Sequence, residues 1–150
     1  MVSSKTLIAK FVSLPALALI GMSRSGKKFG NIAYRTLTSK GYLVYPIHPS
    51  ASSIRGVRCY SRLAQLPVPV EGVLIVVPPT QAVNAVRDAA AAGIRLVWLQ
   101  QGSASPEVLQ VCRDVGVEAI SGECILMYAH ASGIHKAHRW VWGVLGKVPA

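Results

Sequence analysis

The segment from Ala18 to Gly30 constrains the fold of this chain more than any other. A short apolar run ends at Gly21, a loop of hydroxyl and basic residues follows, and an amphipathic pattern begins at Asn31. This order is typical of a β-strand, an anion-binding loop and a helix N-terminus in a nucleotide-binding α/β fold. Glycine lets the backbone approach a phosphate closely, and the helix start adds free N–H groups and a positive dipole end. We therefore expect this loop to bind phosphate.

The glycine spacing separates this loop from two standard phosphate-binding motifs. Gly21, Gly26 and Gly30 do not match the Gly-x-Gly-x-x-Gly fingerprint of dinucleotide-binding folds, and the loop does not match the Walker pattern either. The loop does carry basic residues, Arg24 and Lys28 among them, which can meet a pyrophosphate or remain solvated loop charges. The sequence thus indicates phosphate binding of a nucleotide-like kind outside the standard dinucleotide motif.

Strand-like and helix-like segments alternate along the rest of the chain. Apolar runs predict five strands, at residues 17–21, 43–47, 72–77, 95–99 and 117–120. Amphipathic segments predict helices at residues 4–13, 31–40, 80–92 and 106–115. Such alternation is typical of an α/β fold. It predicts a doubly wound, Rossmann-like parallel sheet of about five strands in a three-layer α/β/α arrangement, whose ligand lies outside the carboxyl ends of the strands.

Several local features accompany this prediction. Thr80 is expected to cap the helix that begins there, and Ile32 is expected to face the core from the helix over 31–40. Residues 51–56 are expected to form a loop, and a short helical turn is expected within 59–66.

The end of the second predicted strand carries no acidic side chain. NAD-binding folds place a carboxylate at this point, where it accepts hydrogen bonds from the ribose hydroxyls. This chain has His48, Pro49 and Ser50 instead, so the local charge is neutral to positive. NAD is therefore disfavoured, whereas a ribose that carries a phosphate, as in NADP, is tolerated.

Composition favours one domain with an anionic partner. At 150 residues, 51% of them hydrophobic, the chain is long enough for one substantial core. Sixteen Lys and Arg against six Asp and Glu give a formal charge of +10, which suits nucleic acid, an anionic membrane surface or a multiply phosphorylated cofactor. The basic residues are scattered from Lys5 to Lys147 without a dense helical stripe, which argues against nucleic acid.

The cysteines and the N-terminal segment bear on location. Three cysteines without a C-x-x-C spacing predict no disulfide framework, which fits the reducing cytoplasm. The apolar stretch from Phe11 to Gly21 follows two lysines and imitates a signal peptide. Its removal would delete the first strand, and it is too short to span a bilayer. We therefore expect a cytoplasmic protein without a transmembrane segment.

No catalytic or metal-binding constellation stands out among the reactive side chains. The four histidines, which are His48, His130, His135 and His138, match no zinc spacing, so no metal site is expected. Cys124 follows the fifth predicted strand, and a helix that began there would favour its thiolate. A nucleophile also needs a base and an oxyanion site, and the sequence assigns neither. A small, half-buried pocket residue is the favoured interpretation of Cys124.

The C-terminal segment from Ile134 to Lys147 mixes apolar, aromatic and basic residues, including Trp140 and Trp142. An amphipathic helix of this composition can cover its own domain, pair two copies of the chain or touch a membrane surface. Packing on its own domain or on a dimer partner is the default expectation.

Five segments, taken in order, resemble the single-domain CoA-binding proteins, whose Rossmann-like fold is shared with the CoA-binding domain of the succinyl-CoA synthetase α subunit. The resemblance covers about residues 7–124. It rests on Ala-Leu-Ile-Gly-Met-Ser-Arg-Ser at 18–25, Gly-Tyr-Leu-Val-Tyr-Pro-Ile-His-Pro at 41–49, Val-Val-Pro-Pro at 76–79, Ala-Gly-Ile-Arg-Leu-Val-Trp-Leu-Gln-Gln-Gly at 92–102 and Gly-Glu-Cys at 122–124. It implies one domain over residues 1–150, with 125–150 as a basic, aromatic C-terminal tail outside the resemblance.

The resemblance also implies a set of binding residues along the predicted edge of the sheet. The CoA phosphates would be received by Ser23, Arg24 and Ser25, with Gly21 and Lys28 beside them. The adenosine moiety would lie near His48, Pro49 and Ser50. A wall along the sheet edge would be formed by Val77, Pro78, Leu99, Gln100 and Gln101. Cys124 takes the place of a cysteine in the synthetase's loop after the fifth strand.

Three functions remain open at this point. The first is a binding module for coenzyme A or an acyl-CoA without turnover, because the synthetase performs its chemistry with a histidine in a second domain that this chain lacks. The second is an enzyme, either an NADP-type oxidoreductase or an acyl-transfer subunit that uses Cys124. The third is a protein-interaction module that recruits a partner through its C-terminal tail.

Overall fold

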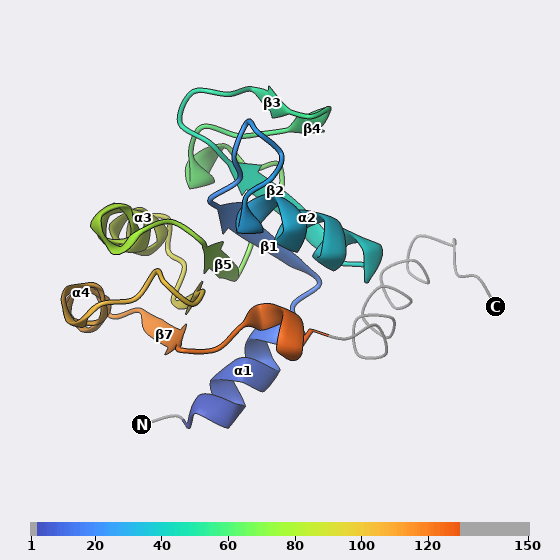
Figure 1. Cartoon of the computed structure of the whole chain (residues 1–150). Helices are drawn as coiled ribbons and strands as arrows, with labels where there is room; N and C mark the ends of the chain where they lie inside the picture. The colour runs from blue at the N-terminus through green and yellow to red at the C-terminus, as the bar shows by residue number, and fades with distance from the viewer. Residues whose placement is uncertain (1–2, 130–150) are drawn as a thin grey trace.

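The computed structural model describes residues 3–129 and places a parallel sheet between layers of helices (Figure 1). The strands of this sheet are β1 (Ala16–Ile20), β2 (Leu43–Ile47), β5 (Gly72–Ile75), β6 (Leu96–Leu99) and β7 (Glu118–Ser121). Their order is β2-β1-β5-β6-β7, and every neighbouring pair is parallel. The predicted doubly wound α/β sheet is confirmed, and its strand order is the flavodoxin-like one.

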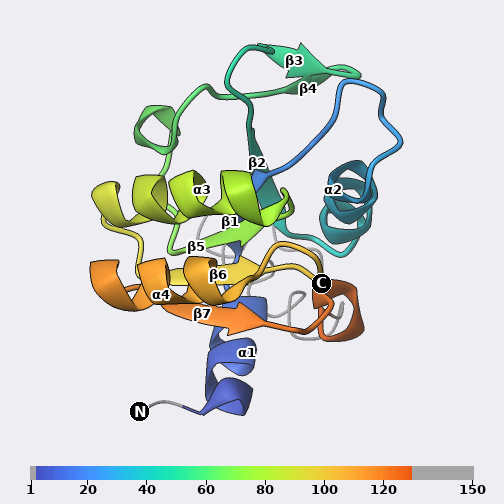
Figure 2. The same ribbon diagram turned by 60° about the vertical axis from the view of Figure 1, so that its left-hand side comes forward.

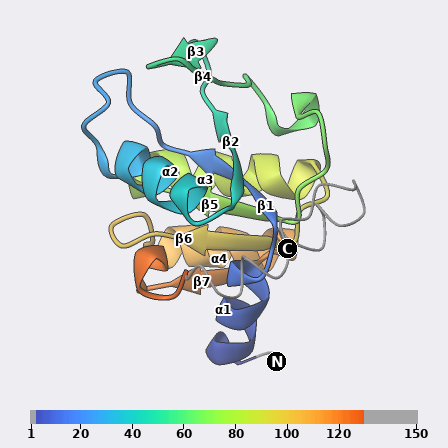
Figure 3. The same ribbon diagram turned by 90° about the vertical axis from the view of Figure 1, so that its right-hand side faces the viewer.

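Two helices cover each face of the sheet. The helices α1 (Ser4–Val12) and α2 (Phe29–Ser39) pack on one face, and α3 (Pro79–Ala91) and α4 (Pro106–Val115) pack on the other (Figures 2 and 3). Side chains of β1 alternate between the two cores, with Leu17 and Leu19 in the first and Ala18 in the second. Every residue of β5 and β6 is buried, as expected for central strands covered on both faces.

Trp98 of β6 joins three parts of the molecule. Its ring is fully buried and packs edge-on against Phe11 of α1, with 5.4 Å between ring centroids. On its other side it meets Tyr128 at 5.9 Å, and its indole Nε1 donates to the carbonyl of Glu123 at 3.0 Å. A buried indole needs such an acceptor. The loop after β7 is therefore anchored to the first helix through one side chain.

Two of the expected local features are wrong at helix starts. α3 begins at Pro79 with Pro78 as its N-cap, so Thr80 lies in the first turn. Proline is favoured at the first helical position, which Pro79 occupies, because its fixed φ suits the helix. The N–H that proline lacks is one that a helix leaves unpaired at this position. α2 begins at Phe29, and Ile32 is 41% exposed. Its neighbour Asn31 takes the inward position instead and is 2% exposed.

The connection from β2 to β5 also differs from the expected loop over 51–56. A small antiparallel hairpin forms there, from β3 (Ser53–Ile54) and β4 (Val57–Arg58), with Arg55 and Gly56 at its turn. Two-residue strands are too short to show a pattern of alternation, so the sequence carries little sign of them. The expected helical turn within 59–66 is present as the 3₁₀ helix η1 (Leu63–Gln65).

The fold continues past the end of the predicted core. The 3₁₀ helix η2 (Ile125–Met127) follows β7, and both Ile125 and Ala129 are buried in the core that contains Trp98. The first part of the expected tail, residues 125–129, therefore packs against the sheet core. The tail itself, with Trp140, Trp142 and the three C-terminal histidines, lies outside the described residues. Within residues 3–129, no helix has both the length and the hydrophobicity needed to cross a membrane.

The position of Trp98 makes a prediction about stability. Replacing Trp98 by Phe removes the hydrogen bond to Glu123 and leaves space beside Phe11, so we expect the free energy of unfolding to fall by about 2–4 kcal/mol. Urea denaturation followed by circular dichroism measures this loss. Val68→Ala serves as the control, because Val68 is exposed and its truncation should change stability by no more than about 0.5 kcal/mol. Equal effects of the two substitutions would contradict the anchoring role of Trp98.

Candidate functional site

The carboxyl edge of the sheet contains a topological switch point between β1 and β5. The chain leaves β1 towards α2 on one face and leaves β5 towards α3 on the other, so the two loops diverge. Ligands of open α/β sheets bind at such points. Gly21 stands at the split with φ 135°, and a Cβ on it would lie 2.6 Å from the carbonyl oxygen of Val76. Only glycine fits there, because the adjacent strand backbone occupies the space of a side chain.

A second glycine brings α2 against the same loop. A Cβ on Gly30 would lie 2.3 Å from the carbonyl oxygen of Gly21, so the first turn of α2 packs directly on the backbone that leaves β1. Lys28 is the N-cap of α2 and makes no side-chain capping bond to the helix. The first amides of α2 therefore lie beside the loop without a side-chain acceptor, the arrangement that suits an anion. The glycine pair provides the close approach even though its spacing differs from the dinucleotide fingerprint.

Asn31 holds the loop in place, and the sequence reasoning missed it. Its side-chain oxygen accepts from the amide of Ser23 at 3.1 Å, and its side-chain nitrogen donates to the carbonyl of Ser23 at 2.9 Å. Both bonds reach one residue, so the carboxamide fixes the position of Ser23 along and across the loop. The available signal was a polar side chain on the inward face of the predicted helix.

The loop from Ser23 to Lys28 is tied internally by serine hydroxyls. The Ser23 and Ser25 hydroxyls lie 3.1 Å apart, the amide of Ser25 donates to the Ser23 hydroxyl at 3.2 Å, and the amide of Lys27 donates to the Ser25 hydroxyl at 3.2 Å. The Gly26 amide donates to the Ser23 carbonyl at 3.0 Å. The loop is thus a compact turn whose hydroxyls and amides are close enough to serve one anion together.

Arg24 connects this loop with the end of β2. Its Nη2 donates to the Ser50 hydroxyl at 2.8 Å, so two residues that the resemblance assigns to different parts of a ligand lie side by side. His48 stands next to them, and its Nδ1 accepts from the amides of Ser50 at 3.2 Å and Ala51 at 2.9 Å. Partial burial and then the positive charge of Arg24 lower the pKa of His48. The imidazole is therefore neutral at neutral pH and acts as an acceptor.

A cavity of about 420 Å³ lies beside this contact. Its lining includes His48, Pro49 and Ser50 from the end of β2, Arg58 from β4 of the hairpin and Tyr60 just after it. The Arg58 guanidinium lies 5.1 Å from the centre of the Tyr60 ring, a cation–π arrangement. Arg58 and Tyr60 were not among the expected residues, because they lie on and just after a hairpin that the sequence did not reveal.

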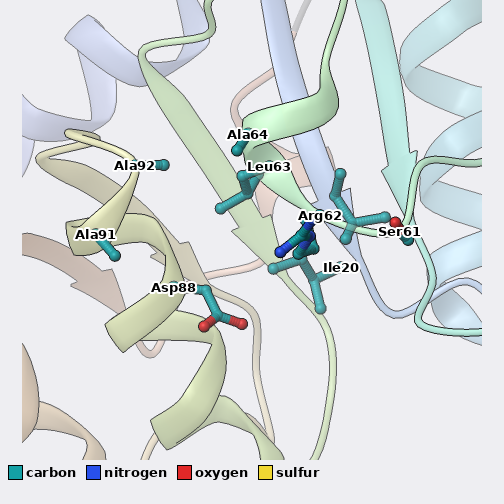
Figure 4. Close-up of a pocket in the computed structure, with 9 residues that line it drawn as sticks. Ile20, Ser61, Arg62, Leu63, Ala64, Asp88, Ala91 and Ala92 are labelled. Carbon is teal, nitrogen blue, oxygen red and sulfur yellow. The ribbon is translucent and has the colours of Figure 1, made fainter.

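A second, smaller cavity adjoins the first at Ser61. The one helical element in the connection from β2 to β5 is the short η1, where the other crossovers have a full α-helix that covers the sheet. A space of about 210 Å³ remains between η1 and α3. Ile20 and Ile47 contribute to its lining, and Figure 4 shows Arg62 and Asp88 directed into it. The sequence reasoning did not anticipate this cavity, since it arises from the shortness of a crossover.

The expected wall residues fall into two groups. Val77, Pro78, Gln101 and Cys124 have exposed or partly exposed side chains at the carboxyl edge. Leu99 is fully buried in the second core, and Gln100 is 4% exposed, with its side-chain oxygen accepting from the Ile125 amide at 3.1 Å. Leu99 and Gln100 therefore support the edge from the protein interior.

The setting of Cys124 differs from the helix start that would favour a thiolate. It precedes η2, a 3₁₀ helix of only three residues, so the α-helix on which a dipole effect would depend does not begin there. The neighbouring carboxylate of Glu123 accepts from the Tyr128 hydroxyl at 2.7 Å. Among residues 3–129, no three His, Cys, Asp or Glu side chains gather in a way that could hold a metal ion.

The charges of the chain are divided unevenly along its length, which a count over the whole chain conceals. Residues 1–70 hold ten Lys and Arg and no Asp or Glu, whereas residues 71–150 hold six of each. The entire formal charge of +10 therefore comes from the half that carries the loop after β1, the end of β2 and the hairpin. This half of the edge suits a multiply charged anion.

Comparison with known proteins agrees with this geometry. The family model described as a CoA binding domain matches residues 16–130. An uncharacterised Bacillus subtilis protein, YneT, is 24% identical over 115 residues, which are 77% of this chain and 84% of that protein. A solved structure of a conserved hypothetical protein from Pyrococcus furiosus is 36% identical with a TM-score of 0.69, and the match covers 75% of this chain and 97% of that one.

The chain also matches part of a larger protein. The ADP-forming acetate–CoA ligase I of Archaeoglobus fulgidus is 26% identical over 121 residues, which make up 74% of this chain but only 18% of the ligase. A family model that spans residues 16–130 covers the whole sheet and every loop of the edge described above. This chain belongs to the CoA-binding domain family.

The Asn31 contacts predict a cost when they are removed. Asn31→Ala leaves the amide and the carbonyl of Ser23 without their partner, so we expect the free energy of unfolding to fall by about 1–3 kcal/mol. Ile32→Ala is a matched control one position along, because Ile32 is 41% exposed and outside both cores. Urea unfolding curves of the two variants test this, and a neutral Asn31→Ala would show that Ser23 is held by other contacts.

The His48 contacts predict a pH dependence of stability. The pKa of His48 is lower in the folded chain than in the unfolded one, so the folded state binds fewer protons. Its contribution to stability is therefore present above the unfolded value of about 6.5 and is lost as the pH falls below it. We expect wild-type stability to drop more between pH 7.5 and pH 5.5 than that of His48→Asn, measured by urea unfolding. The other histidines are common to both proteins, so identical pH dependences would exclude this role.

Proposed function

We propose that this protein binds coenzyme A or an acyl-CoA at the carboxyl edge of its sheet, as a binding module without turnover. The observation that carries the proposal is the contact between the loops after β1 and β2. Arg24 donates a hydrogen bond to Ser50 there, beside the first turn of α2, which has no side-chain cap. A ligand with phosphates at two separated positions suits this contact, because each loop can receive one of them. Membership of the CoA-binding domain family supports the same ligand.

The phosphates occupy the loop after β1 in this proposal. Ser23, Arg24, Ser25 and Lys28 receive them, with Gly21 giving the backbone its close approach. CoA brings a diphosphate and a ribose 3′-phosphate to an edge whose half of the chain contains no carboxylate. The absence of a carboxylate at the end of β2 removes the usual partner of an unphosphorylated ribose and leaves room for the phosphorylated one.

The adenosine moiety lies in the 420 Å³ cavity lined by His48, Pro49 and Ser50. Tyr60 offers an aromatic face there, and Arg58 adds a cation beside it. The hydroxyl of Ser50, already bonded to Arg24, lies between the cavity and the loop. We therefore assign the 3′-phosphate to Arg24 and Ser50.

The pantetheine arm runs along the other half of the edge. Val77, Pro78, Gln101 and Cys124 have side chains that can line its path, and Leu99 and Gln100 hold that path in shape from the interior. Cys124 has a binding role in this proposal. Buried Cys59 and Cys112 and half-buried Cys124 are all free thiols, which suits the cytoplasm as the place of action.

Titration calorimetry tests the proposal with CoA, dephospho-CoA and NADP as ligands. We expect CoA to bind most tightly, because it alone fills the loop and the 3′-phosphate position together. Arg24→Gln should weaken CoA about tenfold and dephospho-CoA much less, since a lost charge-assisted bond to one phosphate is worth about 1.4 kcal/mol or more.

Arg87→Gln is the control for charge, because Arg87 is an exposed cation on α3, outside the edge loops. It should leave all three affinities unchanged. Failure of wild-type protein to bind CoA would reject the proposed function, and preference for NADP would favour an oxidoreductase. An equal loss of CoA and dephospho-CoA in Arg24→Gln would move the 3′-phosphate away from Arg24.

A further inference from the structure

Arg55 has an unusual backbone conformation. Among residues 3–129 it is the only residue other than glycine with a positive φ, at 51°. With Gly56, at φ 80°, it forms the two-residue turn between β3 and β4. Such turns require positive φ at both positions and favour asparagine or glycine. An arginine carries a steric cost there, and such strain at a single residue points to a task for its side chain.

The side chain of Arg55 reaches back to the loop after β1. Its Nη2 donates to the carbonyl of Ser25 at 2.5 Å. Its Nε lies 2.9 Å from the place that a Cβ on Gly26 would occupy, so the arginine lies directly against that glycine. The hairpin, 30 residues further along the chain from Ser25, therefore places a guanidinium on the turn that Ser23 and Ser25 form.

The guanidinium is only partly satisfied by this contact. It has five N–H donors arranged as a planar fork, and the carbonyl of Ser25 is a single neutral acceptor. Residues 1–70 hold no carboxylate, so the chain offers no acidic partner from the elements that surround the loop. Arg24 points the other way, towards Ser50. Arg35 of α2 donates to the carbonyl of Gly26 at 3.3 Å. Three arginines thus lie at the loop: Arg24 within it, Arg35 from α2 and Arg55 from the hairpin.

We infer that Arg55 is a further anion-binding residue, which exchanges the carbonyl of Ser25 for the oxygens of a diphosphate held on the loop. A bidentate bond from the fork to a phosphate is stronger than one bond to a carbonyl. The inference rests on the proposed function only for the identity of the ligand as CoA. It assigns the diphosphate to Arg55 and leaves the 3′-phosphate with Arg24.

The turn geometry gives a test that separates binding from structure. Arg55→Gly relieves the positive φ and removes the side chain, so we expect a melting temperature equal to or above that of the wild type. The same variant should bind CoA and dephospho-CoA about tenfold more weakly, by equal factors, because both ligands contain the diphosphate. Arg55→Gln keeps the strain and loses the charge, and it should show the same loss of affinity.

Calorimetric titrations of inorganic pyrophosphate, CoA and dephospho-CoA into wild type, Arg55→Gly, Arg55→Gln and the Arg87→Gln control complete the experiment. Pyrophosphate tests the anion site without the rest of the ligand. Pyrophosphate binding that depends on Arg55, with no binding of CoA, would support Arg55 and reject the proposed function.

Undiminished CoA binding in both Arg55 variants would overturn the inference and leave the proposed function standing. A joint fall of melting temperature and affinity in Arg55→Gly would give the side chain a purely structural role and also overturn it. Wild-type protein that binds neither pyrophosphate nor CoA would reject both.

Discussion

The contact between the backbones of Gly21 and Gly30 sets the geometry on which the whole edge depends. A single methyl group on Gly30 would lie 2.3 Å from the Gly21 carbonyl oxygen, so α2 could not stay where it is. Its distance from β1 decides whether Asn31 reaches Ser23, and Ser23 in turn carries the turn that holds Ser25 and Gly26. Close approach of two backbones thus places the hydroxyls and amides of the loop, and a larger residue would displace α2 from it.

The other half of the edge, after β6 and β7, is held by two buried side chains. Trp98 fixes the segment after β7 through Glu123, and Gln100 fixes the start of η2 through Ile125. Both side chains lie on or just after the same strand, β6, in the middle of the second half of the sheet. The edge therefore has two unlike halves, one shaped by buried packing and the other by arginines and hydroxyls.

Much of the fold could be predicted from the sequence because most of the main strands are apolar runs, and because α2, α3 and α4 end close to a glycine or begin with a proline. The loop after β1 could be predicted for the same reason, since its glycines and hydroxyls stand directly behind such a run. Strand order could not be predicted, because an apolar run does not indicate which other strands it pairs with. The roles of Asn31 and Arg55 depend on contacts across 8 and 30 residues, which no local pattern encodes. The absence of Asp and Glu from residues 1–70 could have been seen in the sequence, but the net charge of the whole chain does not show it.

The short crossover between β2 and β5 has a consequence for how the molecule moves. The β1–β2 part of one sheet face is covered there by a three-residue 3₁₀ helix over a cavity, whereas β5 and β6 are buried on both faces. Segments with fewer buried contacts open at a lower free energy than the global unfolding of the domain. The amides around β2, the hairpin and η1 are therefore the ones expected to exchange with solvent first. A ligand that bridges Arg24, Ser50 and Arg55 would hold the loop after β1, the end of β2 and the hairpin together, so binding is expected to slow the opening of this part.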